Sequence, residues 1–283
     1  MSGSLNRLII VAGPTAVGKT AYAIQLAKQL GTEVISCDSR QFYREMRIGV
    51  ARPSDEELQA VPHHFIACRS VDNPYNIYDY HRDAAAVAER LIAERGSAVA
   101  VGGSGLYIEA LTDGVSRLPD PAPELRTTLQ RMPLEEKRRR LQELDPEYYE
   151  RVDRDNPVRL QRALEVCLTV GRPYSHVLRE QRPVPPAFSC ELRVLEMEPD
   201  ELRRRIDRRV DSMMADGLAD EVRSLLPLRH LPTLRTVGYS ELFEALDGTI
   251  TVEEAVAKIK LNTWHYARKQ MTWLRREQKK RKQ

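Results

Sequence analysis

The feature that most restricts the fold of this chain is the pattern G-x4-G-K-[ST] at residues 13–20. An apolar run at residues 8–11 precedes it, as is typical of a buried parallel strand. A helical stretch at residues 21–30 follows and ends at Gly31. A strand, a glycine-containing loop and a helix in this order form a phosphate-binding loop (P-loop), because backbone N–H groups and the helix N-terminus converge on phosphate oxygens. The pattern therefore predicts an α/β core with a phosphate site.

Two side chains of the P-loop have specific roles in this prediction. Lys19 neutralises the distal phosphate, and the Thr20 hydroxyl completes the shell of a Mg2+ ion. A simple tight turn that opens a helix is the alternative, but it needs no Lys-Thr pair. The predicted phosphate ligands are Gly13, Pro14, Thr15, Ala16, Val17, Gly18, Lys19 and Thr20.

The remainder of the chain alternates between strands and helices, interrupted by one purely helical region. We expect strands at residues 34–37, 65–67, 98–101 and 192–195, and helices at 78–94 and 201–226. Proline clusters near Pro119 and Pro185 bound the helical region. The predicted fold is a P-loop NTPase-like parallel sheet core (1–118 and 188–283) with an inserted all-helical domain (119–187).

Composition excludes several classes of protein. The 283 residues are 42% hydrophobic, enough for a sizeable core. No apolar run approaches the roughly 20 residues of a membrane span, and no leader segment is recognisable, so we expect a cytoplasmic protein without membrane contact. The four cysteines lie far apart and contain no CxxC pair, which argues against a zinc ribbon or a disulfide framework.

Charge is distributed unevenly along the chain. Residues 258–283 carry ten Lys or Arg and one acidic residue, a net charge of +9. The rest of the chain has a net charge of −6. A basic terminus on an acidic body suggests contact with a polyanion, although a solvated basic helix has the same composition.

The second predicted strand ends in a carboxylate, Asp38. Nucleotide hydrolases carry an acidic residue after an apolar strand, but here residues 98–101 are followed by Gly102 and Gly103. Since ligands lie outside the carboxyl ends of parallel strands, we expect Asp38 and the P-loop at neighbouring strand ends. Asp38 is a candidate metal ligand or base; a helix N-cap is the alternative.

Motifs beyond the P-loop extend in an ordered series along nearly the whole chain. The series consists of Asp38-Ser39-Arg40-Gln41-Phe42-Tyr43, Ile48-Gly49, Pro62-His63-His64, Gly102-Gly103-Ser104-Gly105-Leu106-Tyr107, Asp155-Asn156-Pro157, Arg159, Arg162-Ala163-Leu164-Glu165, Arg205-Ile206, Arg209, Val237-Gly238-Tyr239, Tyr266-Ala267-Arg268-Lys269-Gln270 and Thr272-Trp273. Together with the P-loop, this series resembles the tRNA dimethylallyltransferases, the isopentenyltransferase (IPP transferase) family. Val50, Arg52, Ser104, Trp264 and His265 depart from the family pattern.

The resemblance implies a specific reaction. A dimethylallyl group passes from dimethylallyl diphosphate to N6 of the adenosine at position 37, beside the anticodon, in tRNAs that read codons beginning with U, and diphosphate is released. The implied partners are dimethylallyl diphosphate and the tRNA anticodon stem-loop, the implied cofactor is Mg2+, and we expect a monomer.

The resemblance also assigns roles to residues of this chain. It implies that Asp38 is the general base and that Arg209 contacts the diphosphate with Lys19. For Arg205, the same role and an ion pair with Glu201 are equally supported. The implied tRNA contacts are Asp38, Ser39, Arg40, Gln41, Ser104, Val158, Arg159, Leu160, Gln161, Arg162, Arg235, Gly238 and Tyr239.

Several other side chains are expected to serve packing. We assign Phe42 to the core and expect Tyr266 and Trp273 to pack the C-terminal helix against it. Adjacent histidines cannot easily share one ion, so His63 and His64 are expected to pack or form hydrogen bonds. Three other functions remain open: a P-loop kinase for a small metabolite, a prenyltransferase for free adenine nucleotides, and an RNA-binding module whose P-loop only controls affinity.

Overall fold

The computed structural model describes residues 6–282 and divides the chain into two units. The core unit comprises Met1–Thr112 and Pro186–Gln283, and the helical unit comprises Asp113–Pro185. Within residues 6–282, no helix is both long enough and apolar enough to cross a membrane.

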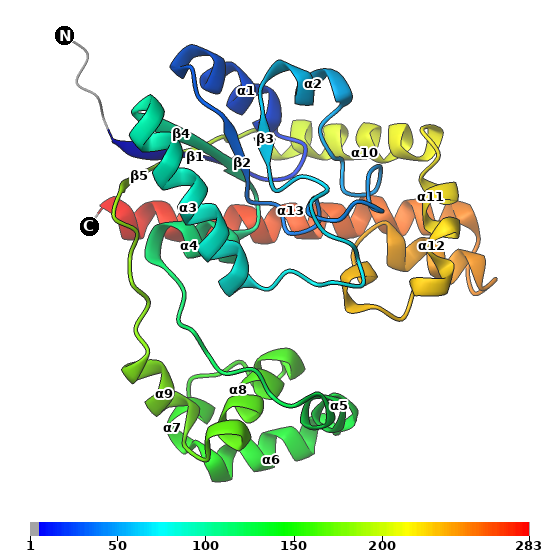
Figure 1. The fold of residues 1–283 in the computed structure, drawn as a ribbon. Helices are drawn as coiled ribbons and strands as arrows, with labels where there is room; N and C mark the ends of the chain where they lie inside the picture. Colours follow the sequence, from blue (N-terminus) through cyan, green and yellow to red (C-terminus); the bar gives the residue numbers. More distant parts are fainter. Residues whose placement is uncertain (1–5, 283) are drawn as a thin grey trace. The chain divides into compact units, whose positions relative to one another are not determined.

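The core unit is built on a five-stranded parallel sheet with the order β3-β2-β4-β1-β5 (Figure 1). The central strand β4 pairs with β1 on one side and β2 on the other. This arrangement confirms the predicted α/β fold with a parallel sheet. The strands are β1 (Arg7–Ala12), β2 (Val34–Ser36), β3 (His63–His64), β4 (Ser97–Gly102) and β5 (Ser189–Val194).

Both faces of the sheet are buried, which explains the continuous apolar runs in its strands. Along β1, Ile9 and Val11 pack against α1, whereas Leu8 and Ile10 pack on the opposite face. That opposite face is covered by α3, α4 and the end of α13. The helices are α1 (Lys19–Leu30), α3 (Ile77–Arg95), α4 (Gly105–Asp113) and α13 (Val252–Lys282).

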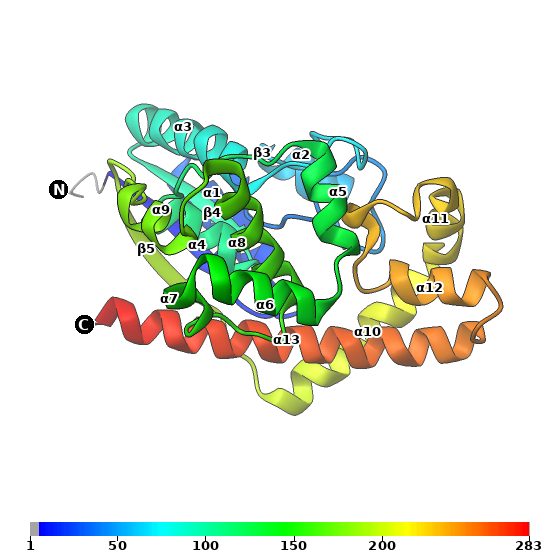
Figure 2. The same cartoon turned by 90° about the horizontal axis from the view of Figure 1, so that it is seen from below.

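A second apolar cluster of the core unit surrounds Tyr239, which is fully buried. Figure 2 shows α13 running past α10 and α12, with which it packs. The elements outside the sheet layers are α2 (Asp55–Ala60), α10 (Pro199–Ala215), α11 (Leu218–Ser224), the short 3-10 turns η1 (Leu226–Leu228) and η2 (Pro232–Leu234), and α12 (Tyr239–Leu246).

The helical unit contains helices alone among its described elements. Its core forms around Leu160, Leu164 and Leu141, all fully buried. The helices are α5 (Pro123–Arg131), α6 (Leu134–Leu144), α7 (Pro146–Tyr149), α8 (Pro157–Val170) and α9 (Tyr174–Glu180).

Two local predictions were wrong. The third strand is His63–His64 rather than residues 65–67, because Phe65 and Ala67 have φ angles of 62° and 49°, outside the β region. The predicted helix over 201–226 is broken into α10 and α11 at Gly217, whose φ is 97°. This break turns the chain so that α11 can pack against α12.

Candidate active site

The P-loop connects β1 to α1, and its lysine folds back over it. Lys19 Nζ donates a hydrogen bond to the Pro14 carbonyl oxygen at 2.8 Å. Gly18, directly before the helix, has a φ of 101°, a conformation that glycine adopts without strain. A Cβ at Gly13 would lie 2.8 Å from the Leu195 carbonyl oxygen, so the start of the loop tolerates no side chain. The helix N-terminus and the lysine are thus set at one edge of the sheet.

Asp38 follows β2 and reaches the same edge. Its Oδ1 accepts a hydrogen bond from the Arg40 backbone N–H at 3.0 Å. The expectation of neighbouring strand ends was wrong, because β4 lies between β1 and β2. The carboxylate and the P-loop therefore face each other across the end of the central strand.

Glycines at the end of β4 permit this approach. A Cβ at Gly102 would lie 2.7 Å from the Cβ of Cys37, which precedes Asp38. A Cβ at Gly103 would lie 3.1 Å from the Gly13 carbonyl oxygen and would collide with the Gln270 side chain. The two glycines let three segments converge above one strand end.

A cavity of about 310 Å³ opens at this point of convergence. One end is polar and contains Thr15, Asp38, Ser39 and Arg209. The volume is at the small end of the roughly 300–1,000 Å³ range of ligand pockets, as a small substrate requires. The apolar side chains that line the cavity all belong to the apolar cluster around Tyr239, and we call this part of the cavity its apolar end; they are Val50, Val210, Met213, Leu218, Val237 and Ile259.

Burial lowers the pKa values of two cations near Asp38, Lys19 and Arg209. Desolvation lowers the pKa of Lys19 to about 8, Asp38 opposes this shift, and Arg209 adds to it. Desolvation also lowers the pKa of Arg209, with Asp38 opposing. The three groups therefore interact with one another, and the cationic pair is arranged to gain stability from an anion with several charges.

Arg205 lies one turn before Arg209 on α10, beside the P-loop. A Cβ at Gly18 would lie 3.8 Å from Arg205 Nη2. The Glu201 carboxylate pairs with Arg204 and Arg208, at 2.9 and 3.2 Å. Arg205 is thus close to the P-loop and also interacts electrostatically with Glu201, and both roles that the sequence left open for it stay predictions.

Gln270, which the sequence analysis placed in a motif without a role, joins three parts of the site. Its Oε1 accepts a hydrogen bond from the Thr15 backbone N–H at 2.8 Å, and its Nε2 donates to the Gly103 carbonyl oxygen at 2.9 Å. The buried amide on α13 thereby holds the P-loop against the end of β4. The separation of 255 residues between Gln270 and Thr15 gave no local signal for this contact.

The predicted tRNA contacts of the core unit fall into two groups: side chains that are hydrogen-bonded or buried within the protein, and residues that line the cavity or lie at the surface. The Gln41 amide donates to the Val50 and Ala51 carbonyl oxygens at 3.3 and 3.1 Å, so it supports a loop of the cavity. Arg40 donates to the Thr233 carbonyl oxygen at 2.7 Å.

Tyr239 is fully buried, and its side chain belongs to the core, not to an RNA-facing surface. Ser39 and Gly238 line the cavity, Ser104 is half-buried, and Arg235 is exposed.

The predicted contacts of the helical unit lie on the first two turns of α8. Val158 and Arg159 are exposed, whereas Leu160 is fully buried and packs in the core of that unit. Gln161 and Arg162 both bind the buried carboxylate of Glu165, at 3.0 and 3.2 Å. Leu160 is therefore removed from the predicted set of contacting side chains.

The aromatic side chains differ in their roles. Phe42 is fully buried, and Trp273 packs against Gly105 and donates from Nε1 to Glu109 at 3.1 Å, as packing roles require. Tyr266 lines the cavity and is 43% exposed, so its assignment to core packing was wrong.

The histidine pair forms hydrogen bonds within the core unit. His63 Nδ1 lies 2.7 Å from the Val61 carbonyl oxygen, and His64 Nε2 lies 2.6 Å from Glu33. Among residues 6–282, no cluster of three or more His, Cys, Asp or Glu side chains could bind a metal ion.

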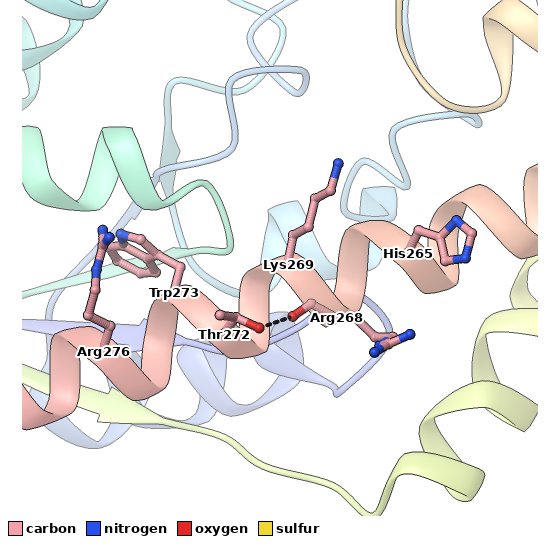
Figure 3. A pocket seen from close by; sticks show the side chains of 6 residues that line it. All are labelled: His265, Arg268, Lys269, Thr272, Trp273 and Arg276. Carbon is pink, nitrogen blue, oxygen red and sulfur yellow. Dashed lines mark hydrogen bonds between the residues drawn. The ribbon is translucent and has the colours of Figure 1, made fainter. Parts of the chain in front are cut away.

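A second, open groove lies along α13 and is strongly basic. Figure 3 shows its lining side chains, with Lys269 extending away from the helix. Its volume is about 480 Å³, and Arg268, Lys269 and Arg276 are exposed. Cations beside an aromatic ring suit the phosphates and bases of RNA. The groove is lined by His265, Arg268, Lys269, Thr272, Trp273 and Arg276.

Comparison with known proteins shows the family of this chain. A sequence model of the family described as IPP transferase matches residues 41–277. A tRNA dimethylallyltransferase of Christiangramia forsetii is 42% identical over 277 residues, covering 96% of this chain and 91% of that protein. One of Flavobacterium psychrophilum is 40% identical over 282 residues, covering 96% and 92%.

Solved structures extend the likeness to the fold. The full-length tRNA isopentenylpyrophosphate transferase of Bacillus halodurans superposes with a TM-score of 0.68 at 33% identity, covering 95% of this chain and 87% of that one. A eukaryotic dimethylallyltransferase acting on tRNA superposes with a TM-score of 0.80 at 25% identity, covering 95% and 69%. Since the family match spans most of the sequence and the relatives align over nearly its whole length, the chain belongs to the IPP transferase family.

Proposed function

We propose that this protein transfers a dimethylallyl group from dimethylallyl diphosphate to N6 of the adenosine at position 37, beside the anticodon, in tRNAs that read codons beginning with U. The observation that carries this proposal is the cavity in which Asp38 faces Arg209 and the P-loop. A proton acceptor, a diphosphate cradle and an apolar recess occur together there. The family membership supports the same substrates, because its members are named for them.

Diphosphate departure is the first requirement of the reaction. The allylic C–O bond breaks, its electron pair goes to the diphosphate, and negative charge grows on the leaving group. Lys19 and Arg209 lie where they can stabilise that charge, and their lowered pKa values mean that an anion relieves their unfavourable environment. Interactions that strengthen as the charge develops accelerate the step.

Proton removal is the second requirement. The exocyclic N6 is a poor nucleophile, and its N–H becomes acidic as the new C–N bond forms. Asp38 accepts that proton, which contributes typically 10²–10⁴-fold. Its hydrogen bond from the Arg40 backbone N–H fixes one carboxylate oxygen and leaves the other for the substrate.

Mg2+ fits this site as a cofactor held mainly by the substrate. The Thr20 hydroxyl, in the first turn of α1, is the protein ligand we propose. An ion with so few protein ligands takes the rest from phosphate oxygens and water, as Mg2+ does. When bound, it would neutralise part of the charge on the diphosphate.

Exposed Lys and Arg side chains are the tRNA contacts that we propose. The groove on α13 carries Arg268, Lys269 and Arg276, and Arg235 is exposed near the cavity residue Gly238. In the helical unit, the exposed start of α8 at Val158 and Arg159 is a further proposed contact. Sequence-specific RNA recognition favours unpaired loops, such as an anticodon loop, whose bases can be extruded. As the resemblance implies, we also propose that the enzyme is a monomer and acts in the cytoplasm.

One incubation tests the proposal. The protein, labelled dimethylallyl diphosphate, Mg2+ and unmodified tRNA are mixed, and the tRNA is digested to nucleosides. We expect N6-prenyl adenosine and one released diphosphate per transfer. Free AMP and ATP replace tRNA in parallel reactions, and product from these but not from tRNA would favour the free-nucleotide prenyltransferase instead.

A P-loop kinase remains the rival from another reaction class. It would hydrolyse or transfer the γ-phosphate of ATP, which a prenyltransferase has no need to do. We expect no ATP turnover above background with or without tRNA. ATP-dependent phosphorylation without prenyl transfer would overturn the proposal.

A further inference from the structure

The carboxylate of Glu221, on α11, collects four hydrogen bonds from two separate segments. Its Oε2 accepts from the backbone N–H groups of Arg47 and Ile48, at 3.0 and 2.8 Å. Its Oε1 accepts from the Gly49 N–H at 3.1 Å and from the Tyr239 hydroxyl at 2.5 Å. One charged group therefore fixes three consecutive peptides and the start of α12, and hydrogen bonds to charged groups are the stronger ones.

The segments that Glu221 holds form part of the walls of the apolar end of the cavity; the rest of that end is lined by Val210 and Met213 of α10 and Ile259 of α13. Gly49 and Val50 line it from the tethered loop, and Leu218 lines it from the first turn of α11 itself. Val237 and Gly238 line it from the residues directly before Tyr239. The wall residues from the loop, from α11 and from the segment before Tyr239 are therefore attached to the same carboxylate or lie within a few residues of an attachment point.

The ring of Tyr239 packs directly against the loop that Glu221 holds. A Cβ at Gly49 would lie 2.5 Å from the Tyr239 ring, so the loop and the ring are in direct contact. Burial and the Glu221 carboxylate both raise the pKa of the Tyr239 hydroxyl, which keeps it protonated as a donor. The Gln41 amide, which donates to the Val50 and Ala51 carbonyl oxygens, holds the far side of the same loop.

We propose that Glu221 is a positioning residue that fixes the apolar end of the cavity at a size that admits a five-carbon prenyl chain and excludes longer ones. This inference rests on the proposed function. Val210 and Met213 follow Arg209 on α10 by one and four residues and line the same cavity, so a donor held by its diphosphate at Arg209 would have these apolar side chains within reach of its prenyl chain. Glu221 acts through the position of these walls and touches no reacting atom.

Donor selectivity tests the proposal. We compare kcat/KM for dimethylallyl and geranyl diphosphate, with tRNA as acceptor, in the wild type and in Glu221→Gln and Tyr239→Phe. The Glu221→Gln variant keeps one accepting oxygen and loses the other, whereas Tyr239→Phe keeps the ring and loses only the hydroxyl. Asp247→Asn is the matched control, because it breaks the exposed ion pair with Arg229 next to α12 without touching the walls.

The wild type is expected to prefer the five-carbon donor by about 100-fold or more, and Glu221→Gln to reduce that preference about tenfold. Tyr239→Phe shifts it in the same direction by less, and Asp247→Asn leaves it unchanged. A purely structural role would lower both activities together, so unchanged selectivity in Glu221→Gln and Tyr239→Phe overturns the inference. If Glu221→Gln does not fold, Tyr239→Phe alone decides.

The failure of the proposed function gives a different result from the failure of this inference. A wild-type protein that prenylates tRNA from neither donor overturns the function itself. A wild type active with dimethylallyl diphosphate that accepts geranyl diphosphate equally well overturns only the role of Glu221.

Discussion

The cavity of the core unit and the surface of the helical unit differ in how their charged side chains are paired. In the core unit, Asp38 and Arg209 line one cavity and interact electrostatically with Lys19, and the pKa values of the two cations are lowered. In the helical unit, Arg172 forms a two-pronged ion pair with Glu180, at 3.0 and 2.9 Å, on an exposed surface. Similar exposed Arg–Glu pairs recur along α6 and α7.

This difference distinguishes cations that can bind an anionic ligand from charged side chains that form exposed ion pairs at the protein surface. An exposed ion pair contributes about 0–1 kcal/mol, because water already solvates both partners. A partly desolvated charge without a matched partner is unfavourable until an anion arrives. We therefore expect charge substitutions in the core cavity to lower activity, and substitutions that break an exposed ion pair of the helical unit, such as that of Arg172 with Glu180, to have little effect.

The largest expected effect is at Asp38. Asp38→Asn keeps an oxygen that can accept the Arg40 N–H and removes the proton acceptor. We expect the rate of prenyl transfer to fall by about 10²–10⁴-fold, measured in single-turnover reactions, with tRNA affinity within a few-fold of wild type. A variant that retains more than a tenth of the wild-type rate would show that the base lies elsewhere. If the wild type itself transferred no prenyl group but bound tRNA, an RNA-binding module would be favoured over an enzyme.

In the helical unit, we expect substitutions of buried apolar side chains to affect stability more than substitutions of exposed charged ones. Leu160→Ala removes a fully buried side chain from its core and should reduce the unfolding free energy of that unit by about 2–5 kcal/mol. Hydrogen exchange of peptides from residues 113–185 measures the effect, while exchange in the sheet should not change. Leu168→Ala, on the same helix but 40% exposed, is the control. Equal destabilisation by both variants would contradict the assigned burial.

The lowered pKa of Lys19 predicts a pH dependence for the core cavity. The ammonium is charged below about pH 8 and loses its proton above it, so diphosphate binding should weaken as the pH rises. We expect kcat/KM for dimethylallyl diphosphate to fall up to tenfold per pH unit above about pH 8, since this ratio reports the free enzyme. Lys19→Arg should remove this decline because the guanidinium remains charged. A flat wild-type profile from about one pH unit below that pKa to one above it would refute the assignment.

The smallest expected effect is at the surface of the helical unit. Arg172→Gln breaks the pair with Glu180, and we expect a change in unfolding free energy below about 1 kcal/mol. Chemical denaturation measures the stability, and prenyl transfer should be unchanged. A measurable loss of prenyl transfer would mean that this arginine contacts RNA. Exposed ion pairs of the helical unit would then also contribute to substrate binding.

Local patterns predicted most of the elements, because apolar periodicity and glycine positions act over a few residues. The P-loop, α1 and α3 were found in this way, and so was the carboxylate at Asp38. The break at Gly217 was missed although a glycine inside a helical pattern is itself a warning. The charged residues around it, spaced at helical intervals, concealed the end of α10.

The contacts that organise the site lie beyond the reach of local patterns. Glu221 meets its loop across 172–174 residues, and nothing in the sequence near it distinguishes it from a solvated glutamate. The placement of β4 between β1 and β2 is equally a property of the assembled sheet. Such pairings depend on topology, so a single sequence indicates the participants but not their partners.

The two glycines at the end of the central strand β4 limit which other side chains could be placed in this site. Nucleotide hydrolases place an acidic residue at that position, yet here any side chain at Gly102 would strike Cys37, and one at Gly103 would strike Gln270. Restoring the acid would push the Asp38 segment and the α13 amide away from the phosphate loop. A single substitution that adds an acidic residue at Gly102 or Gly103 is therefore expected to disturb the arrangement of Asp38, Gln270 and the P-loop.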